Sequence, residues 1–291
     1  MENSANITQI IINTINTLFE NLLSSIDNNI YSLLDDIIFI GPNILKDSNF
    51  EKIFGTSASN GILLISNSFL LAFIIYYGSK YLLSHFTFSK IETPFSFIIK
   101  LIIFGISMNF SYFIVEQILS INYNITLAIQ SIGEHLFNKE ICFSELINTI
   151  NSNIYIDTNS INIFSIDGLI KSTLSVSLLS LVFSYSLRYI ILKIFILLSP
   201  FAFLSLSLNS TNCFFKSWFK NFFSLLLIQI IVSFVLLLLF SIDYNGANLL
   251  NKFIYIGAIY FLTRVNSFIR EFIGGVSTDI PQSVYNFLSY K

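Results

Sequence analysis

Apolar residues fill long stretches of this chain, and polar residues gather in a few segments between them. The longest apolar stretch runs from residue 169 to residue 241. A soluble domain of this size would not carry so long a hydrophobic stretch, whereas a helix of about 20 apolar residues crosses a bilayer core of about 30 Å. The pattern therefore predicts an all-α, polytopic integral membrane protein with about five, or five to six, transmembrane helices.

The N-terminal part follows a different pattern, because its apolar residues recur every three or four positions among polar ones. This spacing predicts an amphipathic helix over residues 5–39 that is too polar to span a membrane. Its polar face is acidic and includes Glu20, Asp27, Asp35 and Asp36. Two interpretations stay open: the helix lies on the membrane surface, or it packs against a partner subunit.

The alternation of apolar and polar stretches divides the chain into five parts. Residues 1–60 hold the amphipathic helix and a linker outside the membrane, and residues 61–119 hold the first two transmembrane helices. Residues 120–168 are rich in Asn, Ser and acidic residues, and this composition predicts a partly helical extracytoplasmic segment. Residues 169–275 form a C-terminal transmembrane region with a basic-aromatic interfacial helix, and residues 276–291 form a cytosolic tail.

The orientation follows from the Lys and Arg residues near the ends of the spans, which mark the cytoplasmic side. If residues 169–208 cross once, as a long protruding helix or a broken one, the basic residues of the first loop and of the C-terminal region all fall inside. That arrangement has five crossings, with the N-terminus outside and the C-terminus inside. If the same residues cross twice, Lys216, Lys220, Arg264 and Arg270 move outside, against the rule. We therefore expect five crossings.

Composition narrows the range of functions. Only 11% of the residues are charged, the net charge is -2 and the basic residues are scattered, so no sequence-specific nucleic-acid binding is expected. Cys142 and Cys213 are expected to be free thiols, and His85 and His135 lack the spacing of metal ligands. No nucleophile with a base, phosphate-binding glycine loop or pair of carboxylates in a span is recognisable. We expect no catalytic site, no cofactor and no metal.

Arg188 and Lys193 stand in apolar surroundings, where a cation at the bilayer centre costs about 2.5 to 3.5 kcal/mol. Either both lie at headgroup level in a loop between two spans, or they lie within the membrane. In the second case they must line a wet cavity or pair with a carboxylate such as Glu116 or Asp243. Pro200 removes a backbone donor, so we expect the helix to kink or end there, and a break could line a pathway.

A basic-aromatic segment follows at residues 212–223. Lys216 and Lys220 are four positions apart and so share one helix face, while Trp218 and several Phe residues fill the rest. This pattern predicts an interfacial helix, with its lysines toward lipid headgroups and its rings at the membrane boundary. Gln229, a lone polar residue in the next span, is expected to bond to a neighbouring helix.

The order of these features resembles that of the TrbL/VirB-type polytopic inner-membrane subunits of conjugative type IV secretion systems. The similar features are, in order, Arg188-Tyr189, an apolar stretch, Leu198 to Phe203, a polar turn through Thr211, Phe215 to Lys220, and a span with Gln229. The resemblance covers residues 169–275, and the first half of the chain is similar only in layout. Ser199 departs from the pattern, because the family commonly has Ala or Gly there.

The resemblance implies a non-enzymatic, multi-pass protein of the bacterial cytoplasmic (inner) membrane. Such a protein is a structural, channel-forming or scaffold component that supports transfer of DNA and protein. Its implied partners are the lipid bilayer, further copies of itself, pilus and channel proteins, and secretion ATPases. The alternative is a small-molecule transporter or permease subunit, although the internal repeat typical of transporters is not visible in this sequence.

Overall fold

The computed structural model describes residues 33–55, 61–88, 91–146, 166–242 and 249–273, together with the single positions Ile10, Thr14, Thr17 and Thr149. Over these residues every regular element is a helix and none is a strand, which confirms the all-α prediction. Three predicted features lie wholly or largely outside the described residues: the N-terminal amphipathic helix before residue 33, the part of the extracytoplasmic segment at 147–165, and the tail at 276–291.

The described residues include six long helices and three short ones. The long ones are α3 (Gly61–Thr87), α4 (Pro94–Asn109), α5 (Ser111–Phe137), α7 (Ile166–Leu204), α8 (Asn212–Phe240) and α9 (Leu249–Ile273). The short ones are η1 (Pro42–Leu45), α2 (Ser48–Phe54) and η2 (Ser205–Ser207). Residues 33–38 are also helical.

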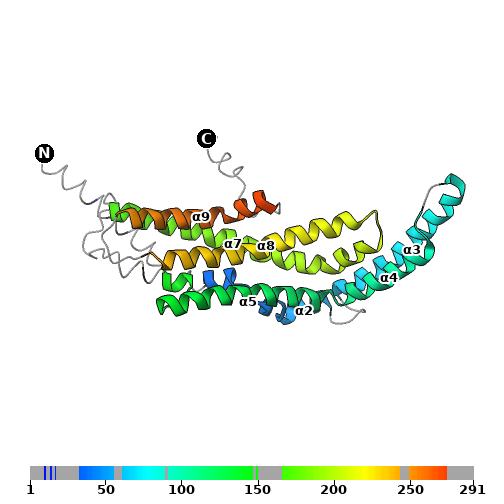
Figure 1. Cartoon of the computed structure of the whole chain (residues 1–291), viewed down its shortest axis with the longest axis horizontal. Coiled ribbons are helices and arrows are strands. Elements are labelled where there is room, and N and C mark those ends of the chain that lie inside the picture. Colours follow the sequence, from blue (N-terminus) through cyan, green and yellow to red (C-terminus); the bar gives the residue numbers. More distant parts are fainter. Residues whose placement is uncertain are drawn as a thin grey trace.

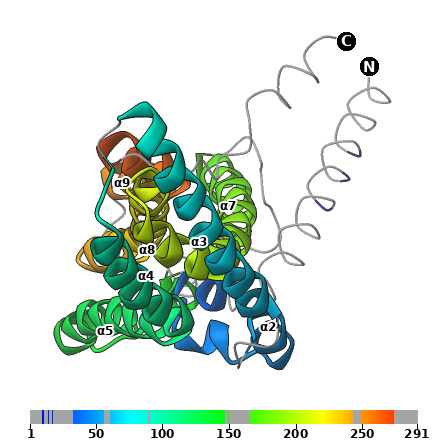
Figure 2. The same cartoon turned by 90° about the vertical axis from the view of Figure 1, so that its right-hand side faces the viewer.

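The helices α5, α7, α8 and α9 run along the long axis of the molecule, and α3 and α4 extend beyond them at one end (Figure 1). The view from that end shows α8 in the interior of the bundle, and α8 packs against α5, α7 and α9 (Figure 2). Burial follows this arrangement: 61% of the most apolar part of α8 is buried inside the protein, against 17% for α3. The side chains of α3 are therefore left to contact lipid or another protein.

The helix α7 is continuous over 39 residues, Ile166 to Leu204. Residues 169–204 thus belong to one helix, so residues 169–208 do not form the two antiparallel helices that a double crossing would need. At about 1.5 Å per residue this helix is about 58 Å long, roughly twice the bilayer core. Pro200 lies inside the helix, which persists for one further turn and tightens into η2.

The apolar stretch at 97–119 is divided between two helices. The break falls at Phe110, and α4 and α5 are bent by 61° relative to each other. After the bend, α5 continues to Phe137, well past the predicted end of the span at residue 119. Asn138 ends α5 in the left-handed conformation, with φ 52°, which asparagine tolerates better than most residues.

Within the described residues, three helices are long and apolar enough to cross a membrane: α3, the stretch Val176–Ser207 and α8. The bent pair of α4 and α5 makes a fourth if the two helices form one broken span. These helices are consistent with an integral membrane protein. The predicted count of five spans, with α9 as the fifth, stays a prediction.

The residues that precede α2 lie inside the helical bundle. We name residues 33–47 the inserted segment; it comprises the helical residues 33–38, an irregular stretch at 39–41, η1 and the two residues that follow η1. Its apolar side chains belong to the main core, and Leu34, Ile38 and Leu45 are fully buried. Irregular backbone buried in this way needs hydrogen-bond partners, and the side chains of Arg188 and Gln229 supply them.

Candidate functional site

Arg188 is the largest fully buried side chain in the described residues, at 1% exposure on α7. Its Nε donates a hydrogen bond to the Leu225 carbonyl of α8 at 2.9 Å, and its Nη1 donates to the Ile38 carbonyl of the inserted segment at 3.1 Å. Nη2 has no hydrogen-bond partner. Arg188 therefore joins three parts of the chain through backbone oxygens.

One interpretation suggested an ion pair of Arg188 with a carboxylate such as Glu116, and the ion pairs among the described residues include neither Arg188 nor Glu116. The other suggested partner, Asp243, lies outside the described residues. Within the described residues Arg188 binds backbone carbonyls. The Ile38 carbonyl lies at the C-terminal end of helical residues 33–38, where the helix dipole favours a cation.

Gln229 of α8 serves the same segment. Its Oε1 accepts a hydrogen bond from the backbone N–H of Ile40 at 3.2 Å, and the side chain is fully buried. The expectation that Gln229 bonds to a neighbouring helix is therefore wrong, because its partner is the irregular backbone at 39–41. Arg188 donates to the Ile38 carbonyl, and Gln229 accepts from the Ile40 N–H. These two bonds satisfy backbone groups at the irregular stretch and so stabilise non-helical backbone in an apolar interior.

Lys193 lies one and a half turns after Arg188 on α7 and is only partly exposed. Its Nζ lies 3.5 Å from Asp47 Oδ2, and it stands 5.3 Å from the centre of the Phe50 ring and 5.1 Å from that of Tyr189. Lys193 therefore forms an ion pair with Asp47, a partner that the sequence did not suggest. The pair fixes the end of the inserted segment on α7.

Asp35 fastens the other end of the inserted segment. Its carboxylate accepts hydrogen bonds from the backbone N–H of Phe143 at 2.7 Å and of Ser144 at 3.1 Å, and also from the Ser144 hydroxyl. Burial raises the pKa of Asp35, while these hydrogen bonds act in the opposite direction. The sequence placed Asp35 on an acidic polar face, and this role was missed because nothing in residues 138–146 marks them as its partner.

The segment 212–223 is helical, as the N-terminal part of α8. Lys216 and Lys220 are exposed, whereas Trp218 is buried at 3% exposure and stacks on Phe222 with ring centres 5.2 Å apart. The Trp218 Nε1 donates a hydrogen bond to the Phe195 carbonyl of α7 at 2.8 Å. The tryptophan is thus a contact between α7 and α8 inside the protein, and the interfacial position of the segment stays a prediction.

Pro200 lies on α7 next to this contact. Because proline has no N–H, the carbonyl four residues earlier loses its helical donor, and the Trp218 bond falls on the adjacent carbonyl, that of Phe195. The hydroxyl of the buried Ser199 has no partner. The Trp218 indole therefore binds α7 where Pro200 weakens the backbone ladder.

A polar cluster of Glu92, Ser96, Lys100 and Asn209 joins two loops at one end of the molecule. Glu92, before α4, forms an ion pair with Lys100 and accepts a hydrogen bond from Ser96 Oγ at 2.7 Å. Lys100 also donates to Asn209 Oδ1 at 3.2 Å, in the turn between η2 and α8. These bonds place the loop before α4 beside the turn before α8, and they hold the pKa of Glu92 below its usual range, chiefly through Lys100.

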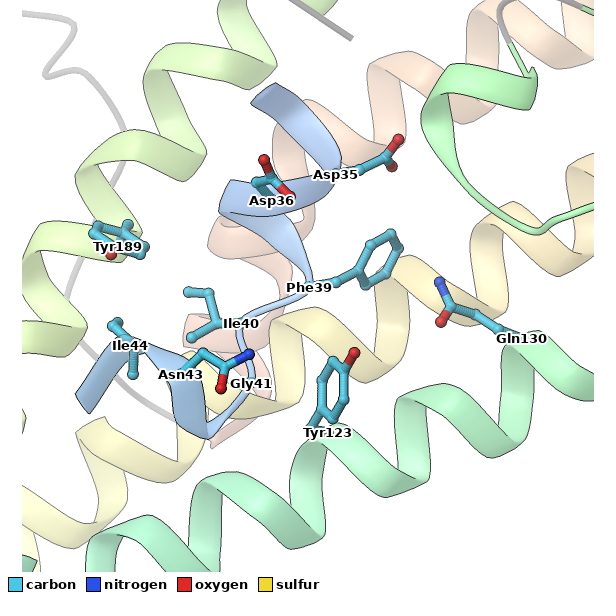
Figure 3. A pocket seen from close by; sticks show the side chains of 10 residues that line it. All are labelled: Asp35, Asp36, Phe39, Ile40, Gly41, Asn43, Ile44, Tyr123, Gln130 and Tyr189. Atoms are coloured by element: carbon cyan, nitrogen blue, oxygen red, sulfur yellow. The ribbon is translucent and has the colours of Figure 1, made fainter. Parts of the chain in front are cut away.

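A cavity of about 470 Å³ opens beside the inserted segment, between α5 and α7 (Figure 3). Tyr123 and Gln130 reach it from α5, and Tyr189 reaches it from α7. The inserted segment supplies the remaining lining residues, Asp35, Asp36, Phe39, Ile40, Gly41, Asn43 and Ile44. Neither Arg188 nor Gln229 lines this cavity, although Ile40, whose N–H is bound by Gln229, is one of the lining residues.

Three buried side chains, Arg188, Gln229 and Trp218, each bind a backbone group of another element. These bonds connect α7, α8 and the inserted segment. Among the described residues no group of three or more His, Cys, Asp or Glu side chains could hold a metal ion.

Comparisons of the chain with protein-family models, with curated proteins and with solved structures found no match.

Proposed function

We propose that the chain is a structural, channel-forming or scaffold subunit of a conjugative type IV secretion system in a bacterial cytoplasmic membrane. One observation carries the proposal: residues of the resembling region, Arg188, Trp218 and Gln229, bind backbone groups of other elements. A pattern whose members fasten elements together suits a subunit of an assembly better than an enzyme.

The proposed topology has five crossings, with the N-terminus outside and the C-terminus inside. The continuous helix α7 supports a single crossing by residues 166–204. The contacts of Glu92 and Lys100 with Asn209 support placing the loop before α4 and the turn before α8 on the same face, which the positive-inside rule makes the cytoplasmic one. In this topology the bent pair of α4 and α5 forms the second crossing and α9 the fifth.

The proposed partners are lipid, further copies of this chain and other secretion subunits, including pilus or channel proteins and a secretion ATPase. The apolar surface of α3 and α4 supports such contacts, since Leu71, Ile75, Leu82 and Phe95 are all more than half exposed. In a membrane these side chains face acyl chains or another subunit. Because α3 and α4 extend beyond the bundle, they are the part of the molecule most open to a neighbour.

The test is deletion of the gene in its native host, followed by complementation with the full chain. We expect conjugative transfer to be lost on deletion and restored by the wild-type chain or by Glu140→Gln, a substitution of an exposed side chain that makes none of the buried contacts described above. The Arg188→Ala, Gln229→Leu double variant should restore transfer poorly. Purification from native membranes should recover a secretion ATPase. Unchanged transfer on deletion would contradict the proposal.

The alternative is a small-molecule transporter or permease subunit. The cavity of about 470 Å³ next to irregular backbone at residues 39–41 favours it, because transporters place irregular backbone beside their binding sites. Reconstitution of the purified chain alone in liposomes separates the two functions. Solute uptake by the lone protein would support the transporter, and its absence together with loss of transfer in the deletion strain would support the secretion subunit.

A further inference from the structure

The cavity beside the inserted segment is acidic. Its lining residues include two carboxylates, Asp35 and Asp36, and none of the ten is Lys, Arg or His. The two acids differ in whether their oxygens are free to bind a ligand. Both oxygens of Asp35 already accept hydrogen bonds from Phe143 and Ser144. Asp36 is exposed, and no hydrogen bond or ion pair with it occurs in the described part of the chain.

The cations close to the cavity are committed elsewhere. Arg188 donates to the backbone carbonyls of Leu225 and Ile38, and Lys193 is paired with Asp47. Lys193 also contacts the Tyr189 ring, so one side of that ring already faces a cation. Asp36 therefore contributes a negative charge to the cavity that no cation of the described residues neutralises by direct contact.

The other residues that line the cavity also suit a positively charged ligand. Rings of Phe39, Tyr123 and Tyr189 line the cavity from three different elements (Figure 3). Aromatic faces attract ammonium groups, most strongly where water is partly excluded. The Gln130 amide nitrogen donates to the Ile141 carbonyl at 2.9 Å, which leaves the amide oxygen as an acceptor. A volume of about 470 Å³ lies within the range of small-molecule sites, about 300 to 1,000 Å³.

We propose that this cavity binds the ammonium group of a small organic cation, with the Asp36 carboxylate as its counter-ion and the rings of Phe39 and Tyr123 as its walls. Two sources carry this chemistry, a free organic ammonium compound and the ethanolamine headgroup of a membrane lipid. The cavity would bind either one whether or not the chain belongs to a secretion machine, because every contact is made within the chain itself.

The first arm of the test uses the purified full chain in nanodiscs of phosphatidylglycerol, titrated calorimetrically with choline and with its neutral isostere 3,3-dimethylbutan-1-ol. We expect choline to bind at least about tenfold more tightly than the isostere, because only choline gains from the carboxylate and the rings. Asp36→Asn should weaken choline binding by a similar factor. Glu140→Gln, which removes an exposed carboxylate outside the cavity, should bind choline as the wild type does.

The second arm uses nanodiscs that contain phosphatidylethanolamine and counts retained lipids by native mass spectrometry. Retention of this lipid by the wild type, its loss in Asp36→Asn, and no binding of free choline would assign the ammonium group to a lipid. Asp36 is exposed, so thermal unfolding of Asp36→Asn should match the wild type and separate lost binding from lost folding. Equal binding of choline and its isostere, unchanged binding by Asp36→Asn, or binding of neither probe would overturn the proposal.

Discussion

At the scale of single residues, Arg188 shows how backbone groups stabilise a buried cation. Its two hydrogen bonds end on carbonyl oxygens of α8 and of the inserted segment, whose partial negative charges favour the cation. Gln229 complements it by accepting from the N–H of Ile40. The side chains therefore hold a stretch of backbone that lacks helical hydrogen bonds of its own.

Arg188→Ala should destabilise the protein by about 2 to 4 kcal/mol, since it removes two charge-assisted hydrogen bonds and leaves a cavity. Arg188→Met keeps most of the volume and removes the buried charge, so it should cost less than the alanine variant. Thermal unfolding in detergent measures both. Limited trypsin digestion at Lys46 should accelerate in Arg188→Ala, because the inserted segment loses an anchor. An alanine variant as stable as the wild type would contradict this role.

The two cysteines should differ in reactivity. Burial raises the pKa of Cys142 to about 11, which keeps its thiol protonated at neutral pH, whereas Cys213 is exposed at the start of α8. The thiolate is the reactive form, so a maleimide should modify Cys213 at least about tenfold faster than Cys142. The variants Cys142→Ser and Cys213→Ser isolate each site for mass spectrometry. Equal rates at the two sites would show that Cys142 is as accessible as Cys213 in solution.

At the scale of elements, the contact between the loop before α4 and the turn before α8 depends on the charge of Glu92. The pKa of Glu92 lies below its ordinary value of 4.5, chiefly because Lys100 bonds the charged form. For a carboxyl group whose pKa falls on folding, the stability it contributes is fully present above the unfolded value and is lost as pH falls through the folded value.

Glu92→Gln should therefore lower the thermal midpoint at neutral pH, and the difference from the wild type should shrink as the pH falls below about 4.5 and vanish below the folded pKa of Glu92. The group is partly exposed, so the difference should be small, and salt should reduce it. Glu140→Gln gives the control for loss of an exposed carboxylate. A difference that persists unchanged in acid would mean that Glu92 acts through packing and not through its charge.

Some features of the elements could be predicted from the sequence, and others could not. The long apolar helices and the polar residues within them were predictable, because hydropathy and isolated polar residues are visible in the sequence. The partners of Arg188 and Gln229 were not, since carbonyl and amide groups of Ile38, Leu225 and Ile40 leave no mark on residue type. The length of α5 was missed because its Asn, Ser and Thr residues suggested a non-membrane segment, although Asn122 and Thr126 are buried.

At the scale of the whole molecule, the helices have two common ends. The loop before α4 and the turn before α8 meet at one end, and the end of α5 lies with the start of α7 at the other (Figure 1). The proposed five-crossing topology makes the first end cytoplasmic and the second extracytoplasmic. This assignment is open to a direct chemical test.

In a background of Cys142→Ser and Cys213→Ser, single cysteines at Ser210 and at Glu140 should be labelled from opposite sides of the membrane. Ser210 is exposed in the turn before α8, and Glu140 is exposed after α5. A membrane-impermeant maleimide should reach Ser210→Cys only in inverted vesicles and Glu140→Cys only in right-side-out vesicles. Labelling of both from one side would remove the proposed topology.

The helix α7 has a consequence for how movement passes through the molecule. It is one rod of 39 residues, and it carries Arg188 near its middle and the Trp218 contact at Phe195 near its C-terminal end. A rigid rod longer than the bilayer is thick acts as a lever, so a tilt imposed at one end displaces the other end in the opposite direction. Because α8 and the inserted segment are hydrogen-bonded to this rod, a subunit docked at one face would shift both of them together.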